Sequence, residues 1–351
     1  MSQMTEVAER PDELEEINRR FNELGFTDGL PIVPPTKARV AAMVAGSGLG
    51  AEETLGPVPP VWGEATVERV AANAVMAGCR PEYMPVVLAA LRGCLDKKFN
   101  LHGVQCTTHL TTPLVVVHGP IAKQLGVNGG NNCFGQGWIA NATIGRALRL
   151  ALVNIGGARP GDIDRATLGH PGKYTYCIAE NEAESPWPAF HVESAGMRPE
   201  QSAVTVFAAE GPHNINNHEY EPHRLLDAIA GTIATPGANN FYVMGDYTVV
   251  LGIDHAKILA AEGWRRSHVQ AYLFEKARLP ISVLRHGGMY SQNIERNLWP
   301  RWIDRSRDTS TVPPVREPAD FKIFVAGGAG PHSVVIAGWG VRAVTVPVEF
   351  P

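Results

Sequence analysis

Short apolar runs that alternate with longer amphipathic segments constrain the fold of this chain more than any other feature. Four such runs are rich in Val, Ile or Phe and are followed by turns with Gly, Pro or His; they cover 113–117, 203–208, 247–251 and 321–326. Between them lie segments with apolar residues at three- and four-residue steps, which is typical of helices. The alternation predicts an α/β protein with a mixed or largely parallel sheet and helices on its faces.

Size and charge narrow the possibilities further. The chain has 351 residues, of which 44% are hydrophobic, enough for two closely packed lobes. We expect an N-terminal α/β lobe with a helical hairpin over 1–200 and a C-terminal α/β lobe over 201–351. A net charge of −4 argues against nucleic acid as a partner. The acidic N-terminus and the absence of a run of ~20 apolar residues predict a cytoplasmic location without membrane attachment.

A short motif recurs after three of the apolar runs. The sequence reads HGP at 118–120, GPH at 211–213 and GPH again at 330–332. Ligands bind beyond the carboxyl ends of strands in open α/β sheets, so these loops are expected to meet at one crevice. The pattern favours a small-molecule substrate bound there.

Histidines are concentrated in two loop regions. Imidazole is a common ligand of transition metals, and carboxylates nearby would transfer protons. The segment AEGPHNINNHEYEPH matches no known metal-binding spacing, and exposed histidines in a polar loop are the alternative. The predicted metal ligands are His102, His109, His213, His218 and His332, and the predicted catalytic carboxylates are Glu210 and Glu219.

The segment LHGVQCTTHLTTP adds a cysteine to this set. If it is extended, His102 and Cys106 share one face while His109 points away. A cysteine beside a histidine is a candidate nucleophile, although a buried thiol is the alternative. The chain has 5 cysteines without a CxxC pair, which argues against a disulfide framework.

Glycine-rich loops supply the candidate substrate-binding residues. Glycines let backbone amides approach an anion closely, and Asn, Arg and Lys side chains orient polar groups. A tight turn without a ligand is the alternative for each loop, and Arg146 or Arg149 is expected to pair with Glu180 or Glu182. The predicted substrate-binding residues are Asn128, Asn131, Arg146, Lys173, Gly328 and Ser333.

Longer motifs resemble a known family across nearly the whole chain. They are DGLPIVPPT, ATVERVAANAVMAGCRPEYMPVVLAAL, ANATIGRALRL, ENEAESPW and AEGPHNINNH. With them the chain resembles an uncharacterised bacterial family grouped with UGSC-type (seleno)proteins. The resemblance implies no settled reaction. The UGSC tetrapeptide is absent, and Cys106 stands where the family has Ala, so no cysteine role carries over.

Three functional hypotheses follow. The favoured one is a metal-dependent enzyme of hydrolase or lyase type that uses an unidentified divalent transition metal. The second is a thiol-dependent redox component that works with a partner protein through Cys106 or Cys133. The third is a non-catalytic subunit of an oligomer, with contacts around four tryptophans: Trp264, Trp299, Trp302 and Trp339.

Overall fold

The computed structural model describes residues 13–287 and 299–349. Its α-helices are α2 (Glu13–Glu23), α3 (Lys37–Ala45), α4 (Val67–Ala77), α5 (Met84–Leu95), α6 (Leu101–Cys106), α7 (Pro120–Leu125), α8 (Ile139–Asn154), α9 (Phe190–Ala195), α10 (Pro222–Ile233), α11 (Asn240–Val243), α12 (Ile253–Ala261), α13 (Arg266–Lys276) and α14 (Ile281–Leu284). Its strands are β1 (Thr54–Val58), β2 (Gly63–Thr66), β3 (Thr112–His118), β4 (Cys177–Ala179), β5 (Ala203–Ala209), β6 (His213–Asn216), β7 (Tyr247–Leu251), β8 (Leu279–Pro280), β9 (Thr311–Val312), β10 (Phe321–Val325), β11 (His332–Ile336) and β12 (Val344–Pro347). The predicted α/β class is confirmed.

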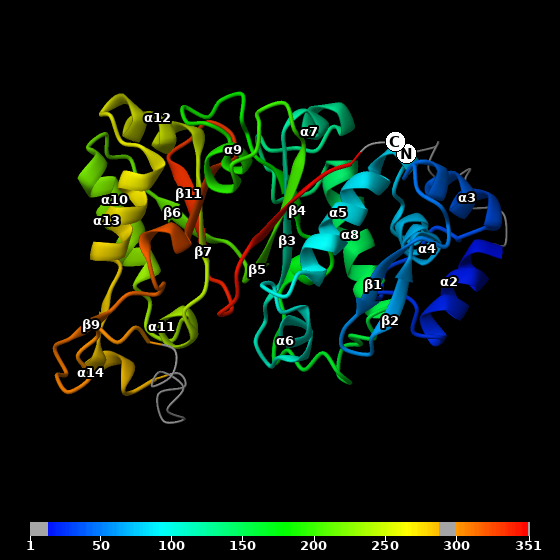
Figure 1. Ribbon diagram of the computed structural model, residues 1–351, viewed down its shortest axis with the longest axis horizontal. Helices are drawn as coiled ribbons and strands as arrows, with labels where there is room; N and C mark the ends of the chain where they lie inside the picture. The colour runs from blue at the N-terminus through cyan, green and yellow to red at the C-terminus, as the bar shows by residue number, and fades with distance from the viewer. Residues whose placement is uncertain (1–12, 288–298, 350–351) are drawn as a thin grey trace, which may run out of the picture.

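Two mixed four-stranded sheets form the centre of the molecule (Figure 1). The first has the order β12-β5-β3-β4, in which β3 and β4 are parallel and the other pairs are antiparallel. The second has the order β10-β7-β11-β6, with only β10 and β7 parallel. The predicted lobe boundary at residue 200 stays a prediction, but the pairing puts β5 and β12 in one sheet with β3 and β4.

The two sheets pack face to face through a shared apolar layer. Leu114, Val116 and Phe207 from the first sheet lie in one buried cluster with Val250 and Phe324 from the second. Alternate residues of these strands point the other way, as the two-residue period of a strand requires. The two inner faces therefore pack on each other, and the outer face of each sheet is left for helices.

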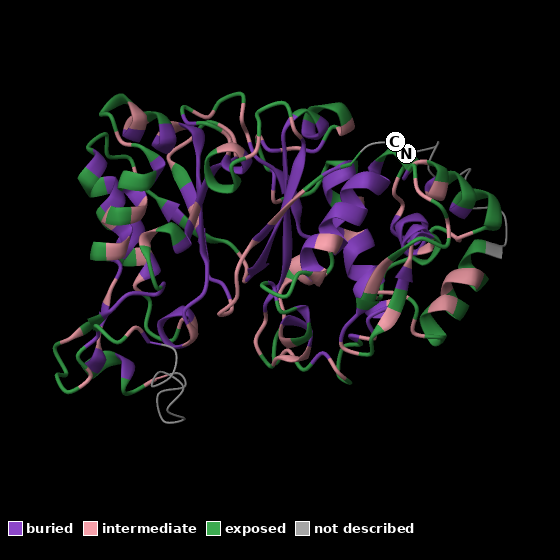
Figure 2. Cartoon of the chain, in the orientation of Figure 1, coloured by how far each residue is buried: buried purple, intermediate pink, exposed green. Residues whose placement is uncertain are grey.

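Helices cover the outer faces of both sheets (Figure 1). Val115 and Val206 of the first sheet lie in a cluster with residues of α4, α5 and α8. Val249 and Ile323 of the second sheet pack against residues of α10, α12 and α13. Figure 2 shows buried strands between helices whose outward faces are exposed. Within the described residues, no helix is both long and apolar enough to cross a lipid bilayer.

Local signals in the sequence set several helix ends as expected. The side chain of Thr36 accepts a hydrogen bond from the Arg39 amide and so caps the start of α3. The Thr66 side chain does the same for Arg69 in α4, and Gly78 ends that helix in the left-handed conformation. Residues 101–106 form α6, so the shared face of His102 and Cys106 that an extended segment would give does not apply.

Gly119 is a position where a side chain is expected to destabilise the fold. Its φ of 79° and ψ of −169° favour glycine, and an added Cβ would lie 2.4 Å from the Gln201 carbonyl oxygen. We expect Gly119→Ala to lower the free energy of unfolding by about 2–4 kcal/mol, measured by urea denaturation. Gly126→Ala is the matched control, since Gly126 also has positive φ but open space around it; its expected loss is about 1 kcal/mol. Equal losses for the two variants would contradict the clash.

Candidate metal centre

Four side chains with metal-ligating groups meet at the carboxyl ends of β3 and β4. His118 is the last residue of β3, and Glu180 and Glu182 follow β4 directly, while His191 lies in the first turn of α9. Because β3 and β4 are parallel, with Val117 beside Ala179, their ends lie at the same edge of the sheet. The ligand atoms of His118, Glu180, Glu182 and His191 all lie within 4.8 Å of one another. Metal bonds of ~2.1 Å need ligand separations up to about 4.2 Å, which is close to this spacing.

His118 is held on both sides of its ring. Its Nδ1 lies 2.8 Å from Glu180 Oε2, and its Nε2 lies 2.9 Å from Thr205 Oγ1. Thr205 is bonded in turn to Thr345 of β12 at 2.9 Å. A nitrogen that faces a carboxylate oxygen at this distance must carry a proton or share a cation with it. The Thr205 hydroxyl fixes the ring orientation, as the outer hydrogen bonds of metal-bound histidines do.

The two glutamates are oriented by backbone amides. The Phe190 amide donates to Glu180, at 2.9 Å from Oε2, and the Gly119 amide donates to Glu182 Oε1 at 2.6 Å. Glu180 is fully buried, whereas the Glu182 side chain is 30% exposed. Burial raises the pKa of Glu182, and the Glu180 charge raises it further, although the bond from Gly119 opposes both effects. Glu182 is therefore the member of the group that both reaches solvent and holds a proton more readily than usual.

His191 is the side chain whose surroundings are least complete. It is fully buried, and neither ring nitrogen has a hydrogen-bond partner among the described residues. Its Nδ1 lies 3.7 Å from Glu182 Oε1, and the carbonyls of Arg198 and Gln201 act on it without reaching hydrogen-bonding geometry. Burial lowers the pKa of His191, and the nearby His118 lowers it too, so the neutral ring is favoured. A neutral imidazole with a free lone pair is the form that binds metal ions.

The charge balance of the cluster favours a cation. Glu180 and Glu182 bring two carboxylates, and the buried Arg266 lies 3.9 Å from Glu180 Oε1. Arg266 is also paired with Glu193, so its charge is already compensated. A cavity of about 550 Å³ beside Glu180 and Glu182 is large enough for a small substrate. The residues present thus fit a divalent ion in ligand type, charge and access.

Sequence reasoning missed this group, although parts of it carried a signal. The recurring HGP motif contains His118 and follows a strand, but it was used to locate the crevice and not as a source of ligands. Glu180 and Glu182 were named as examples of a buried carboxylate that Arg146 or Arg149 would pair with, but the partner of Arg146 is Asp28. His191 has no distinguishing sequence context. Only the fold brings it to the other three.

The predicted metal ligands do not form a common site. The group that comes within metal-binding distance in the described part of the chain contains none of the five predicted histidines. In the register of β6 and β11, His213 pairs with Val335 and His332 pairs with Asn216, so the two histidines point to opposite faces of the sheet. His213, His218 and His332 are all exposed. The expectation that these imidazoles share a crevice is therefore corrected.

The other two predicted histidines lie near the opposite edge of the first sheet. His109 Nε2 lies 2.8 Å from Glu210 Oε1, which joins a predicted ligand and a predicted catalytic residue. The Thr111 amide donates to His109 Nδ1, so the proton of a neutral His109 ring is on Nε2 and is donated to Glu210. His102 is exposed on α6, with its ring 5.8 Å from that of Trp62. The surroundings of Glu219 do not suit a catalytic role, because its side chain is exposed and pairs with Arg224.

Three predicted substrate-binding residues line one cavity with His332. Asn131, Gly328 and Ser333 surround a space of about 500 Å³ between the glycine loop after β10 and the loop before α8. Ser333 Oγ lies 2.7 Å from His255 Nδ1 and accepts a bond from the Gly252 amide. Asn128 instead stabilises its own loop, because it donates to the Asn131 carbonyl and accepts from the Gly130 amide.

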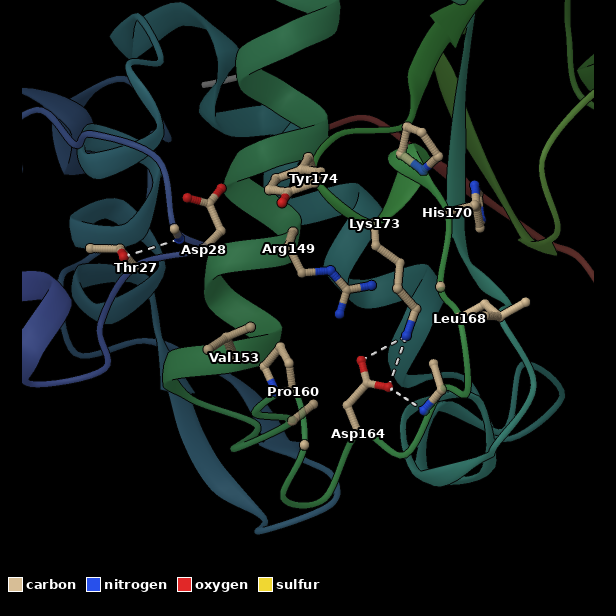
Figure 3. A pocket seen from close by; sticks show the side chains of 16 residues that line it. Thr27, Asp28, Arg149, Val153, Pro160, Asp164, Leu168, His170, Lys173 and Tyr174 are labelled. Atoms are coloured by element: carbon tan, nitrogen blue, oxygen red, sulfur yellow. Dashed lines mark hydrogen bonds and ion pairs between the residues drawn. The ribbon is translucent and has the colours of Figure 1, made fainter.

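The remaining two predicted substrate-binding residues are ion-paired. Arg146 is paired with Asp28, with Nε and Oδ2 2.7 Å apart. Lys173 is paired with Asp164 at 2.7 Å from Oδ2, in the wall of a cavity of about 740 Å³ (Figure 3). Arg149, which was named only as a possible structural partner, lines this same cavity.

Comparison of the chain with family models, curated proteins and solved structures gives no match.

The surroundings of Cys106 predict a thiol of low reactivity at neutral pH. Burial raises its pKa, and the charge of Asp164 raises it further. Because the thiolate is the reactive form, we expect Cys106 to react with iodoacetamide at pH 7 more slowly than an unfolded model peptide, whose thiol pKa is about 8.5. The rate should still rise with pH above about pH 9. Peptide mapping by mass spectrometry measures both effects, and a rate that levels off below neutral pH would contradict them.

Proposed function

We propose that this protein is a metal-dependent enzyme of hydrolase or lyase type. Its centre comprises His118, Glu180, Glu182 and His191, and its substrate is a small polar molecule that enters the cavity beside Glu182. The observation that most supports this proposal is His191, a fully buried imidazole that has no hydrogen-bond partner among the described residues and lies next to two carboxylates. Leaving both nitrogens of a buried ring unpaired costs free energy, and a bound cation would offset this cost.

The four side chains differ in what they would contribute. His118, Glu180 and His191 are buried and would hold the ion. When bound, the ion would act as a Lewis acid on a substrate carbonyl or on water. Glu182 is the partly exposed member, and its raised pKa suits a group that accepts a proton from a nucleophile or from a substrate carbon. Thr205 would act as a positioning residue, because it holds the His118 ring.

The alternative hypotheses have weaker support. A thiol-dependent redox component needs a cysteine of low pKa, but burial raises the pKa of Cys133 to about 11 and that of Cys79 to about 12. Cys106 is shifted in the same direction. A homo-oligomer remains a prediction, and of the four tryptophans named for such a contact, Trp302 is the one with an exposed side chain, at 54%.

Metal content tests the proposal before any substrate is known. We expect the purified protein, stripped with EDTA and then titrated with Zn²⁺, Mn²⁺ or Co²⁺, to bind one equivalent of at least one ion with a rise in melting temperature. His191→Phe should abolish this binding while leaving the metal-free protein folded, because phenylalanine fills the same space without a polar atom. Elemental analysis and thermal denaturation measure these outcomes.

His332→Phe is the matched control, since His332 was a predicted ligand but lies outside the cluster. It should bind metal like the parent. Glu182→Gln separates binding from chemistry, because it should keep the ion and lose turnover in a screen of esters, amides and hydroxy acids. No stoichiometric metal in the parent, or unchanged binding in His191→Phe, would overturn the proposed centre.

A further inference from the structure

A second cavity lies at the other end of the strands of the first sheet, where β3 and β4 begin. Its volume is about 740 Å³, and it is bounded by α8, by the loop that follows α8 and by the turn at 171–173 (Figure 3). The metal centre lies at the other ends of the same two strands. The two sites are therefore separate, and ligand binding in this cavity does not depend on the proposed metal centre.

A buried guanidinium faces this cavity without a carboxylate partner. Arg149 extends from α8 into the space beside Lys173 and Asp164 (Figure 3). Within the described parts of the chain, its side chain bonds only to neutral groups, Gln105 Oε1 at 3.4 Å and Thr112 Oγ1. Arg149 is 8% exposed, and among the described residues no carboxylate lies within ion-pair distance of it. Arginine stays charged even when buried, so a positive charge remains uncompensated here.

The carboxylates around the cavity are already engaged. Asp164 accepts two bonds from Lys173, at 2.8 and 2.7 Å. Asp28 accepts two bonds from Arg146, at 2.7 and 2.8 Å. Among the charged residues that line the cavity, a single positive charge is left after these pairs are counted, that of Arg149. A ligand with one negative charge would complete the balance, whereas a doubly charged phosphate would exceed it.

Unused hydrogen-bond donors point to the same class of ligand. Gln105 Nε2 and His170 Nε2 are buried and have no partner among the described residues. Gln105 contacts Arg149 through its side-chain oxygen, and His170 lines the cavity. His170 Nδ1 accepts from the Gly172 amide, so Nε2 carries the proton of the neutral ring, and the Ala209 carbonyl acts on it without reaching hydrogen-bonding geometry. Donors around an unpaired cation suit carboxylate oxygens.

The rest of the wall is largely apolar, with Val153, Ala158, Pro160 and Leu168 along it. A cavity of this kind binds ligands that have an apolar body and few polar groups. We propose that this cavity binds a small organic monocarboxylate, whose carboxylate pairs with Arg149 while its hydrocarbon part lies against these side chains. Arg149 is the residue that selects the charge of the ligand.

Direct binding to simple probes tests this site. We expect benzoate or hexanoate to bind saturably at concentrations up to about 50 mM, by calorimetry or ligand-observed NMR, and benzamide not to bind. Arg149→Met should weaken benzoate binding about tenfold or more, because a charge-assisted pair is lost. Arg149→Lys should retain part of the affinity. Arg92→Met is the matched control, since Arg92 makes an exposed pair with Glu349 elsewhere on the surface; it should bind benzoate like the parent.

Several results would overturn the inference. One is that neither carboxylate binds, and another is that benzamide binds as well as benzoate. The others are that inorganic phosphate binds more tightly than benzoate, or that Arg149→Met leaves the affinity for benzoate unchanged. If Arg149→Met does not fold, the parent protein still gives an answer through modification of Arg149 by phenylglyoxal, mapped by mass spectrometry. Benzoate should protect Arg149 and leave Arg92 reactive, and a lack of protection would contradict the site. All these readouts are independent of metal binding.

Discussion

The contact between the two central sheets determines the arrangement of everything else in this protein. Phe207 of the first sheet and Phe324 of the second have ring centroids 5.9 Å apart, within a layer that also contains Leu114, Val116 and Val250. Burial of large aromatic and branched side chains is the dominant favourable term in folding. Once these faces are joined, helices can pack only on the outer faces. Both candidate sites lie at the ends of strands β3 and β4, outside this apolar layer.

The first sheet carries side chains of opposite charge at the two ends of its strands. Beyond the carboxyl end of β3, His118 meets two glutamates that lack sufficient positive charge. At the start of the same strand, Thr112 contacts Arg149, a guanidinium with no ion-paired carboxylate in the part of the chain that the structure describes. Strands have only a small net dipole, so the difference arises from the side chains that the loops and helices deliver. One rigid strand thus separates a site suited to a cation from a site suited to an anion.

Much of the fold followed from the sequence, but less of the site did. Apolar periodicity located the strands around Val115, Val249 and Ile323 because burial imposes a regular spacing. The same periodicity carries no information on which strand pairs with which, so the opposite faces of His213 and His332 became visible only with the register. Residues such as His191 and Arg149 resemble ordinary helical positions in the sequence. Their missing partners are a property of three-dimensional packing alone.

The order of strands along the chain has a consequence for how the molecule assembles. Every strand of the second sheet lies in sequence between β5 and β12, which are themselves neighbours in the first sheet. Closing a long flexible loop costs conformational entropy, and folding of the intervening segment reduces that cost by bringing the loop ends together. The second sheet is thus expected to form before β12 docks on β5. Thr345 would bond to Thr205 only at that late step. The hydrogen-bonded chain that orients the His118 ring through Thr205 would then be complete only near the end of folding.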